Sequence, residues 1–148
     1  MEVQQDFREL LALFNAHQVD YLIVGAYALA FYWTPRYTGD LDLLIRSDQK
    51  NAERVVKALQ DFGFGSLNLT AKDFVGADKV IQLGVAPVRI DILTSLSGIS
   101  WEESFSNRSA GTYADLKVYY IGKTEFIRNK RATGRKRDLA DLEAIGEE

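Results

Sequence analysis

Residues 40–45 read DLDLLI, and the two aspartates in this segment most constrain what the chain can fold into. The leucines and the isoleucine suit a buried strand, yet aspartate is depleted in strands because its carboxylate competes with backbone hydrogen bonding. Side chains alternate between the two faces of a strand, so Asp40 and Asp42 share one face and Leu41 lies on the other. Two carboxylates this close repel each other unless a cation intervenes. The segment therefore predicts a cation site where a strand begins.

A third acid of the same kind stands in VRIDILT, residues 88–94. Asp91 lies between two isoleucines in this second strand-like segment and shares a face with Arg89. A metal site shared with a neighbouring strand would explain an aspartate at that position. The chain has no cysteine and one histidine, His17, which excludes thiolate and imidazole metal clusters and a Ser-His-Asp triad. Carboxylate-only clusters suit hard cations, so we expect Mg²⁺, with Mn²⁺ as the alternative.

Upstream of these acids, the apolar segment YLIV ends at Gly25 and runs directly into AYALAFYW, which favours a helix. A strand that passes straight into a helix leaves free backbone N–H groups and the positive end of the helix dipole at one point. Gly25 and Ala26 are therefore candidates for binding phosphate. Thirteen residues, 27–39, separate them from Asp40, which is enough for one helix and a turn. We expect the phosphate site and the carboxylates to face each other.

The net charge of −3 is unevenly distributed along the chain. Residues 123–137, KTEFIRNKRATGRKR, hold seven basic residues and one acid, whereas the remainder holds 11 basic and 20 acidic residues. A basic segment on an acidic body indicates contact with an anion, either the body's own acids or a phosphate-bearing ligand.

Local patterns predict a single domain over residues 1–148, with a core at about 20–121 and a basic helical tail at about 123–146. Helices are expected at 3–18, 26–33, after a cap at Ser47 or Asp48, at 101–108, and twice after Lys123 with a break near Gly134. Strands are expected at 21–24, 41–45, 66–70, 79–85, 88–94 and 116–122. This order predicts an α/β or α+β fold, a mixed sheet packed with helices.

The sequence also limits the setting in which the protein works. No apolar run approaches the roughly 20 residues that span a membrane, and the N-terminus lacks a signal-peptide pattern. We therefore expect a cytoplasmic protein without a membrane partner, and the oligomeric state stays open.

Three motifs together resemble the nucleotidyltransferase superfamily of the DNA polymerase β type. They are Val24-Gly25-Ala26, Asp40-Leu41-Asp42 and Ile90-Asp91-Ile92. Within that superfamily, Arg36-x-Thr38-x-Asp40-Leu41-Asp42 and the tail KRATGRKRDLADLEAI resemble stand-alone bacterial domains related to the AbiEii-type toxins. The resemblance runs from about Tyr21 to Ile145.

The resemblance implies a minimal nucleotidyltransferase fold and Mg²⁺-dependent transfer of NMP from an NTP to a hydroxyl group. The acceptor is an RNA such as a tRNA, a protein or a small molecule, and a toxin–antitoxin setting fits. In this interpretation the metal ligands and catalytic residues are Asp40, Asp42 and Asp91. The nucleotide contacts are Gly25, Ala26, Arg36, Thr38, Lys130 and Arg135, where Lys130 and Arg135 are not separable by sequence from Lys136 and Arg137.

Alternative interpretations remain. The family has Gly or Ser where this chain has Ala26, so a nucleotide-binding or protein-interaction module without turnover is a second hypothesis. The basic tail also fits a solvated helix face paired with acids such as Asp138 and Asp141. Other Asp-x-Asp proteins fit less well: haloacid-dehalogenase-type phosphatases have Thr or Val where this chain has Leu44, Toprim domains require an earlier glutamate, and metal-dependent glycosyltransferases need a longer chain.

Overall fold

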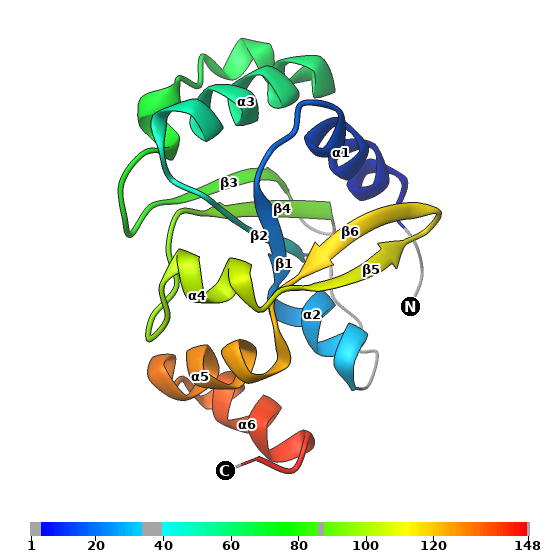
Figure 1. The fold of residues 1–148 in the computed structure, drawn as a ribbon. Helices are drawn as coiled ribbons and strands as arrows, with labels where there is room; N and C mark the ends of the chain where they lie inside the picture. Colours follow the sequence, from blue (N-terminus) through cyan, green and yellow to red (C-terminus); the bar gives the residue numbers. More distant parts are fainter. Residues whose placement is uncertain (1–3, 34–39, 86–87, 148) are drawn as a thin grey trace.

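The computed structural model describes residues 4–33, 40–85 and 88–147, which form one mixed sheet with helices around it (Figure 1). The strand order is β3-β4-β2-β1-β6-β5. The strands are β1 (Tyr21–Val24), β2 (Asp40–Ile45), β3 (Val80–Val85), β4 (Val88–Leu93), β5 (Ser109–Tyr113) and β6 (Leu116–Tyr120). The helices are α1 (Gln5–Ala16), α2 (Gly25–Tyr32), α3 (Gln49–Leu59), α4 (Trp101–Ser106), α5 (Lys123–Thr133) and α6 (Lys136–Ala144). The predicted α+β architecture and helical tail are confirmed.

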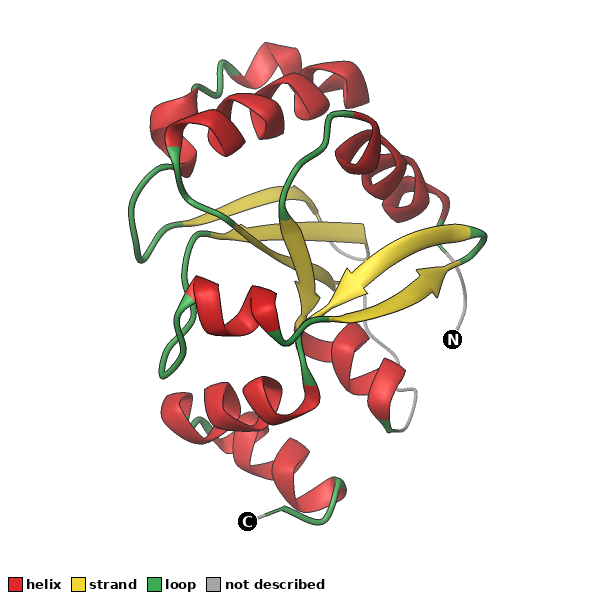
Figure 2. Cartoon of the chain, in the orientation of Figure 1, coloured by secondary structure: helices red, strands yellow, loops and turns green. Residues whose placement is uncertain are grey.

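The directions of the central strands bring one end of β1 beside the beginnings of β2 and β4. Strand β1 is antiparallel to β2, whereas β2 is parallel to β4 and β1 is parallel to β6. The chain therefore leaves the sheet for α2 and for α5 at the same end at which β2 and β4 start. Figures 1 and 2 show α5 and α6 at that end, away from α1 and α3.

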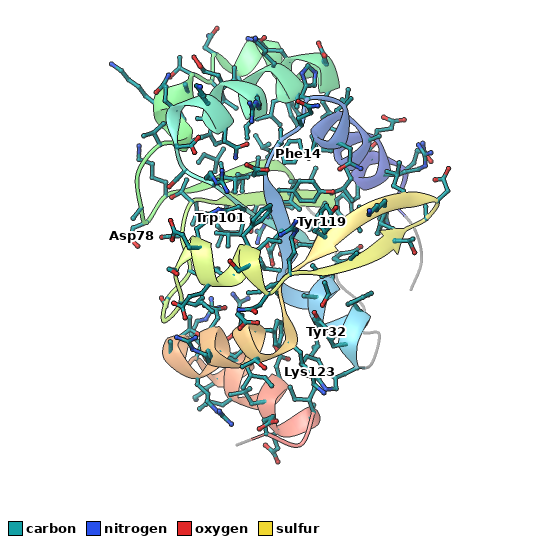
Figure 3. The ribbon with its side chains drawn as sticks, viewed as in Figure 1. Phe14, Tyr32, Asp78, Trp101, Tyr119 and Lys123 are labelled. Carbon is teal, nitrogen blue, oxygen red and sulfur yellow. The ribbon has the colours of Figure 1, made fainter. Side chains whose placement is uncertain are left out.

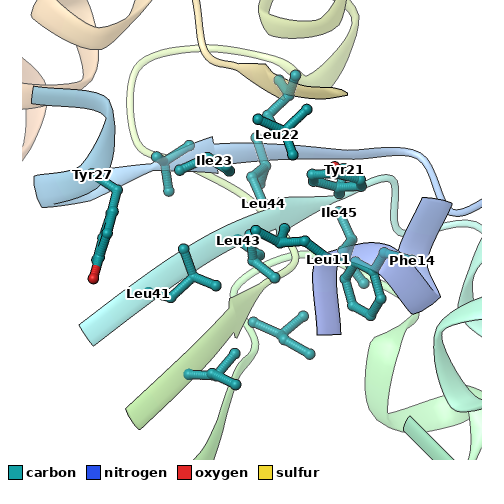
Figure 4. Packing of buried hydrophobic residues seen from close by; sticks show 14 of the residues in the cluster. Leu11, Phe14, Tyr21, Leu22, Ile23, Tyr27, Leu41, Leu43, Leu44 and Ile45 are labelled. Carbon is teal, nitrogen blue, oxygen red and sulfur yellow. The ribbon is translucent and has the colours of Figure 1, made fainter. Parts of the chain in front are cut away.

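Alternation along β2 divides its residues between the core and the site. Leu41, Leu43 and Ile45 are fully buried. Figure 4 shows this side of the strand packed toward Leu11 and Phe14 of α1. Full burial of such a side chain contributes about 1.5–3 kcal/mol, and a slip of one residue would turn the leucines to the site face. The aspartates are thus held on the site face by the burial of their neighbours.

The buried core extends beyond residues 20–121 at both ends. Phe7 and Leu10 of α1 have no exposed surface, and Phe126 of α5 and Leu142 of α6 are buried in the same cluster. Helix α2 is fastened to the end of β6 through Tyr32, whose Oη lies 2.7 Å from the carbonyl oxygen of Ile121. Figure 3 shows Tyr32 above Lys123, where α2 approaches the beginning of α5.

Two strand predictions differ from the structure. Residues 66–70 do not form a strand: Gly65–Leu67 is a 3₁₀ turn and Asn68 adopts a left-handed conformation with φ +55°. Conversely, β5 was not predicted, because SAGTY carries few residues that favour strands. It forms because a tight turn after Tyr113 returns the chain as β6, which pairs with it along its length. Pairing with a neighbour therefore overrides weak local preference.

Predicted boundaries at helix ends are confirmed where a specific cap sets them. The Asp48 carboxylate accepts a hydrogen bond of 2.8 Å from the backbone N–H of Asn51 at the start of α3. Gly134 ends α5 in a left-handed conformation, and its N–H donates to the Lys130 carbonyl. None of the described helices combines the length and the apolar character required to cross a membrane.

Candidate active site

One cavity of about 640 Å³ collects the predicted site residues that the structure describes. It lies between the end of β1, the beginnings of β2 and β4, and the tail helices. The predicted residues that line it are Gly25, Ala26, Asp40, Asp42, Asp91, Lys130 and Arg135. Arg36 and Thr38 lie outside the described residues.

The strand register brings the three acids together. Asp42 is the direct partner of Asp91 in the parallel β2–β4 pair, and Asp40 is the partner of Arg89. Neighbouring strands lie about 4.8 Å apart, and paired residues of parallel strands point to the same face. Asp42 and Asp91, which are 49 positions apart in sequence, thus belong to one cluster of carboxylates on one face of the sheet.

Gly25 is required at the end of β1 for two independent reasons. Its φ of +65° lies in the left-handed region, and a Cβ built there would collide with the Asp42 carboxylate. No side chain of the described residues caps the first turn of α2, so its backbone N–H groups are left for other acceptors. Ala26 lines the cavity within this turn and retains its N–H group.

The environment of Asp42 favours its protonated form. Burial, followed by the charges of Asp91 and Asp40, raises its pKa from 3.8 to about 6. The positive charges of Lys130 and Arg137 act in the opposite direction. At Asp42, burial and the two neighbouring acids together outweigh these cations.

Asp91 experiences the same forces more weakly. Burial raises its pKa, and the charge of Asp40 adds to this, whereas Arg89 opposes it. The Asp42 carboxyl also forms a hydrogen bond that favours the ionised form of Asp91. The two carboxyl groups therefore interact directly, and a cation bound between them would relieve their repulsion.

Arg89 lies between Asp40 and Asp91. One terminal nitrogen donates to Asp40 Oδ2 at 2.8 Å and to Asp91 Oδ2 at 3.4 Å. Its Nε lies 3.3 Å from Asp91 Oδ1, yet both atoms are buried without a hydrogen-bond partner. Within the described residues, no three acidic or histidine side chains are placed to hold a metal ion as they stand. The sequence placed Arg89 on the face of Asp91, but its role between the acids was not predicted.

The two tail cations that were predicted to contact phosphate are paired with acids of the tail itself. Lys130 is 8% exposed, and its Nζ lies 3.1 Å from Asp138 Oδ1 and 3.5 Å from Asp141 Oδ2. Arg135 donates from Nε to Asp138 Oδ2 at 2.6 Å. Burial would raise the pKa of Asp138, but hydrogen bonds from Arg135, Thr133 and Lys130 hold it well below its usual range. These charges fix the angle between α5 and α6.

Arg137 is the tail cation that the geometry separates from its neighbours. It lines the cavity, whereas Lys136 does not, and its charge acts on Asp42. Across the described part of the chain, no hydrogen bond or ion pair engages its guanidinium group. Consecutive basic residues in the sequence gave no signal to choose between Lys136 and Arg137; only the helix face decides it.

Uncharged polar residues complete the lining. Gln82 of β3 is the strand partner of Asp91, and Asn129 of α5 donates to the Ser97 carbonyl at 3.0 Å. Ser95 and Thr133 also line the cavity. Gln82 and Ser95 lie outside the motifs, and Asn129 and Thr133 lie in the basic segment 123–137 but carry no charge that would mark them.

Comparison with known proteins gives similarity in structure but not in sequence. No family model and no curated protein matches the chain. TM1012 from Thermotoga maritima, assigned as a nucleotidyltransferase, has a TM-score of 0.64 and 10% identity, over 97% of this chain and 94% of that one. The lincosamide antibiotic adenylyltransferase LnuA, solved with lincomycin, has a TM-score of 0.59 and 14% identity, over 97% and 96%. The antibiotic-resistance factor ANT(2'')-Ia has a TM-score of 0.57 and 12% identity, over 95% and 83%.

These similarities establish the class of fold. The mixed sheet and its helices match nucleotidyltransferases over nearly the whole chain, so the protein has the nucleotidyltransferase fold. The predicted nucleotidyltransferase fold is confirmed, whereas membership of the superfamily and the closer relationship to AbiEii-type domains stay predictions.

Proposed function

We propose that this protein is a metal-dependent nucleotidyltransferase that moves NMP from an NTP to a hydroxyl group of an acceptor. One observation carries the proposal: three carboxylates, an uncapped helix start and an arginine surround the same cavity of about 640 Å³. Carboxylates suit the metal of a nucleotide complex, and the other two features suit its phosphates. A fold shared with nucleotidyltransferases agrees with this assignment.

The donor set fits a hard divalent cation. Asp40, Asp42 and Asp91 offer only oxygen ligands, and the buried Asp91 Oδ1 has no hydrogen-bond partner. Mg²⁺, or Mn²⁺ in its place, would be held by these three side chains. When bound, such an ion stabilises phosphate charge and makes an acceptor hydroxyl more acidic.

The phosphates would be held by backbone and side-chain donors that line the same cavity as the acids. The N–H groups at Gly25 and Ala26 begin α2 beside Asp42, and Arg137 lines the cavity with its charge acting on Asp42. We assign Arg36 and Thr38 to the same role from their place before β2. Lys130 and Arg135 hold the tail helices in position through their pairs with Asp138, whereas Arg137 contacts the phosphates directly.

The transfer step is an in-line displacement at the α-phosphorus. The acceptor oxygen forms a new bond to this phosphorus while the bond to the β-phosphate oxygen breaks, and pyrophosphate leaves. Asp91 takes the proton that the acceptor hydroxyl loses, a role that rests on the family resemblance and on the position of Asp91 in the cavity. Positioning by the cavity and electrostatic stabilisation are the contributions expected of the protein.

The acceptor is an RNA, a protein or a small molecule. One structural neighbour is an adenylyltransferase that acts on a lincosamide antibiotic, which favours the small-molecule member of this set. A toxin–antitoxin setting rests on the resemblance of the segment 36–42 and the tail to AbiEii-related domains.

The test supplies each of the four NTPs in labelled form, with Mg²⁺ or Mn²⁺, to total RNA, lysate protein and a small-molecule extract. We expect label in one acceptor fraction and matching release of pyrophosphate. Asp42→Asn should abolish both, whereas Asp115→Asn, which alters an exposed acid paired with Arg8, should change neither.

A binding module without turnover is the second candidate, and Ala26 is the feature that favours it. Alanine keeps the backbone donor but has no hydroxyl, so one neutral hydrogen bond worth about 0.5–1.5 kcal/mol is absent. NTP binding with no pyrophosphate from any of the four nucleotides would select this candidate. Restored turnover in Ala26→Ser would locate the defect at this position.

A further inference from the structure

Arg89 occupies the place in the acidic cluster where positive charge is most needed. Its guanidinium contacts Asp40 at 2.8 Å and Asp91 at 3.3–3.4 Å, so one side chain bridges acids from two strands. Parallel pairing fixes this arrangement, because Arg89 is the direct strand partner of Asp40 and precedes Asp91 by two residues. The bridge is therefore built into the register of the sheet.

The bridge is an imperfect one. Only the contact to Asp40 is short, while Arg89 Nε and Asp91 Oδ1 are buried without any hydrogen bond. These two atoms lie 3.3 Å apart as an ion pair but form no hydrogen bond, and a buried charged atom without a hydrogen bond costs free energy. The guanidinium neutralises the charge of the acids but does not provide hydrogen bonds to all of their buried oxygens.

Arg89 also has a route away from the acids. Its side chain is 36% exposed, compared with 12% for Asp91. Its strand partner on β3 is Gly84, which has no side chain to retain it. Release of the guanidinium therefore requires neither strand separation nor opening of the hydrophobic core.

We propose that Arg89 is an internal counter-ion that competes with the divalent cation for Asp40 and Asp91. This inference rests on the proposed function, since it concerns the metal of that site. While the guanidinium bridges the two acids, their oxygens are not arranged for a metal ion. Metal binding therefore includes the cost of releasing Arg89, which lowers the affinity for metal in the absence of nucleotide.

The experiment measures Mn²⁺ binding without nucleotide, by electron paramagnetic resonance of the free ion. Arg89→Gln removes the competing charge and should bind Mn²⁺ at least tenfold more tightly than wild type. Arg8→Gln is the matched control: Arg8 pairs with Asp115 at 2.8 Å and is 32% exposed, but lies away from the cavity. It loses the same charge and should remain within twofold of wild type.

Arg89→Lys separates the bridge from the charge alone. Lysine keeps the positive charge, but its compact ammonium group cannot span both carboxylates as the planar guanidinium does. We expect an affinity between those of wild type and Arg89→Gln. If Arg89→Lys equals wild type, charge alone matters and the bridging role is overturned. If a thermal melt shows that Arg89→Gln does not fold, Arg89→Lys alone tests the inference by its Mn²⁺ affinity relative to wild type.

The outcomes distinguish this inference from the proposed function. Wild-type binding that Asp42→Asn abolishes, with equal or weaker binding in Arg89→Gln, overturns the role of Arg89 and leaves the metal site intact. Absence of Mn²⁺ binding in every variant at millimolar concentration overturns the metal site and the inference together. A second readout is the melting temperature, which Arg89→Gln should lower without metal and Mn²⁺ should restore more fully than in wild type.

Discussion

Asp42 and Asp91 lie directly opposite each other in the parallel pair of β2 and β4, on the face that lines the cavity. Parallel strands keep paired side chains on the same face, so the charge of Asp91 raises the cost of ionising Asp42. A cation bound between the two carboxylates would relieve this repulsion.

The first prediction concerns stability without metal as a function of pH. A pKa raised from 3.8 to about 6 means that the contribution of protonated Asp42 is complete below pH 4 and is lost as the pH rises through 6. In EDTA, wild type should lose about 3 kcal/mol relative to Asp42→Asn between pH 4 and pH 7. Denaturant unfolding at each pH measures this difference.

The groups that face Asp42 are Asp40, Asp91, Lys130 and Arg137, and the last two reduce the effect. Asp91→Asn should lower the pKa of Asp42 and so reduce the loss of stability between pH 4 and pH 7, because it removes one of the two acids that act on Asp42. A difference between wild type and Asp42→Asn that stays constant with pH would contradict the prediction.

The second prediction compares two glycines with nearly the same backbone conformation. Gly25 and Gly134 have φ of +65° and +60°, but a Cβ at Gly134 meets only the Arg131 carbonyl at 3.8 Å, whereas one at Gly25 collides with Asp42. Gly134→Ala should cost about 1–2 kcal/mol from backbone strain. Gly25→Ala should cost about 1–3 kcal/mol more, because Asp42 must move. Equal decreases in the free energy of unfolding, measured in urea, would show that the Asp42 side chain moves aside at no cost.

The third prediction concerns the buried charges of the tail. Asp138 has no exposed surface and accepts from both Lys130 and Arg135. Asp138→Asn leaves Lys130 without its nearest counter-charge and should cost about 3 kcal/mol at neutral pH. Because the pKa of Asp138 is depressed, this loss should be complete above pH 4 and should diminish as the pH falls further.

The matched control for Asp138 is Asp115→Asn, which removes an exposed acid from a surface pair. Such pairs contribute about 0–1 kcal/mol, so this variant should change the free energy of unfolding little. Similar losses in the two variants would show that the tail pairs are no stronger than surface pairs.

The fourth prediction tests which tail cation contacts the nucleotide. Arg137→Gln should raise KM for the NTP about tenfold, the loss expected for one hydrogen bond to a charged group. Lys136→Gln removes the same charge outside the cavity and should leave KM nearly unchanged. Steady-state kinetics on the accepted NTP measure both values, and equal effects would mean that only the total charge of the tail matters.

The sequence predicted the parts of the site that depend on local alternation. Asp40 and Asp42 share a face because they are two residues apart, and Gly25 marks a turn that requires positive φ. Asp91 was expected from its place between two isoleucines to share a site with a neighbouring strand, but the parallel pairing of β2 with β4 that brings it beside Asp42 could not be derived from alternation. The direction of neighbouring strands is set by the whole sheet, not by either segment alone.

The roles of the basic residues were less predictable for a physical reason. Lys130, Arg135 and Arg137 carry the same charge in one short segment and all line the cavity, but only the α5–α6 hairpin decides which of them pair with Asp138. Likewise, β5 forms from a sequence with weak strand preference because β6 pairs with it. Tertiary contacts settled both questions.

The pairing within the tail has a consequence for encounters with other molecules. Several of its cations are matched by nearby acids: Lys130 and Arg135 by Asp138, Arg128 by Glu103, and Arg131 by Glu147. Because these acids offset its cations, the tail has a smaller net positive charge than its basic residues alone indicate, and the rest of the chain is acidic. We expect the long-range field of the molecule to oppose the approach of polyanions such as RNA and to attract cationic compounds.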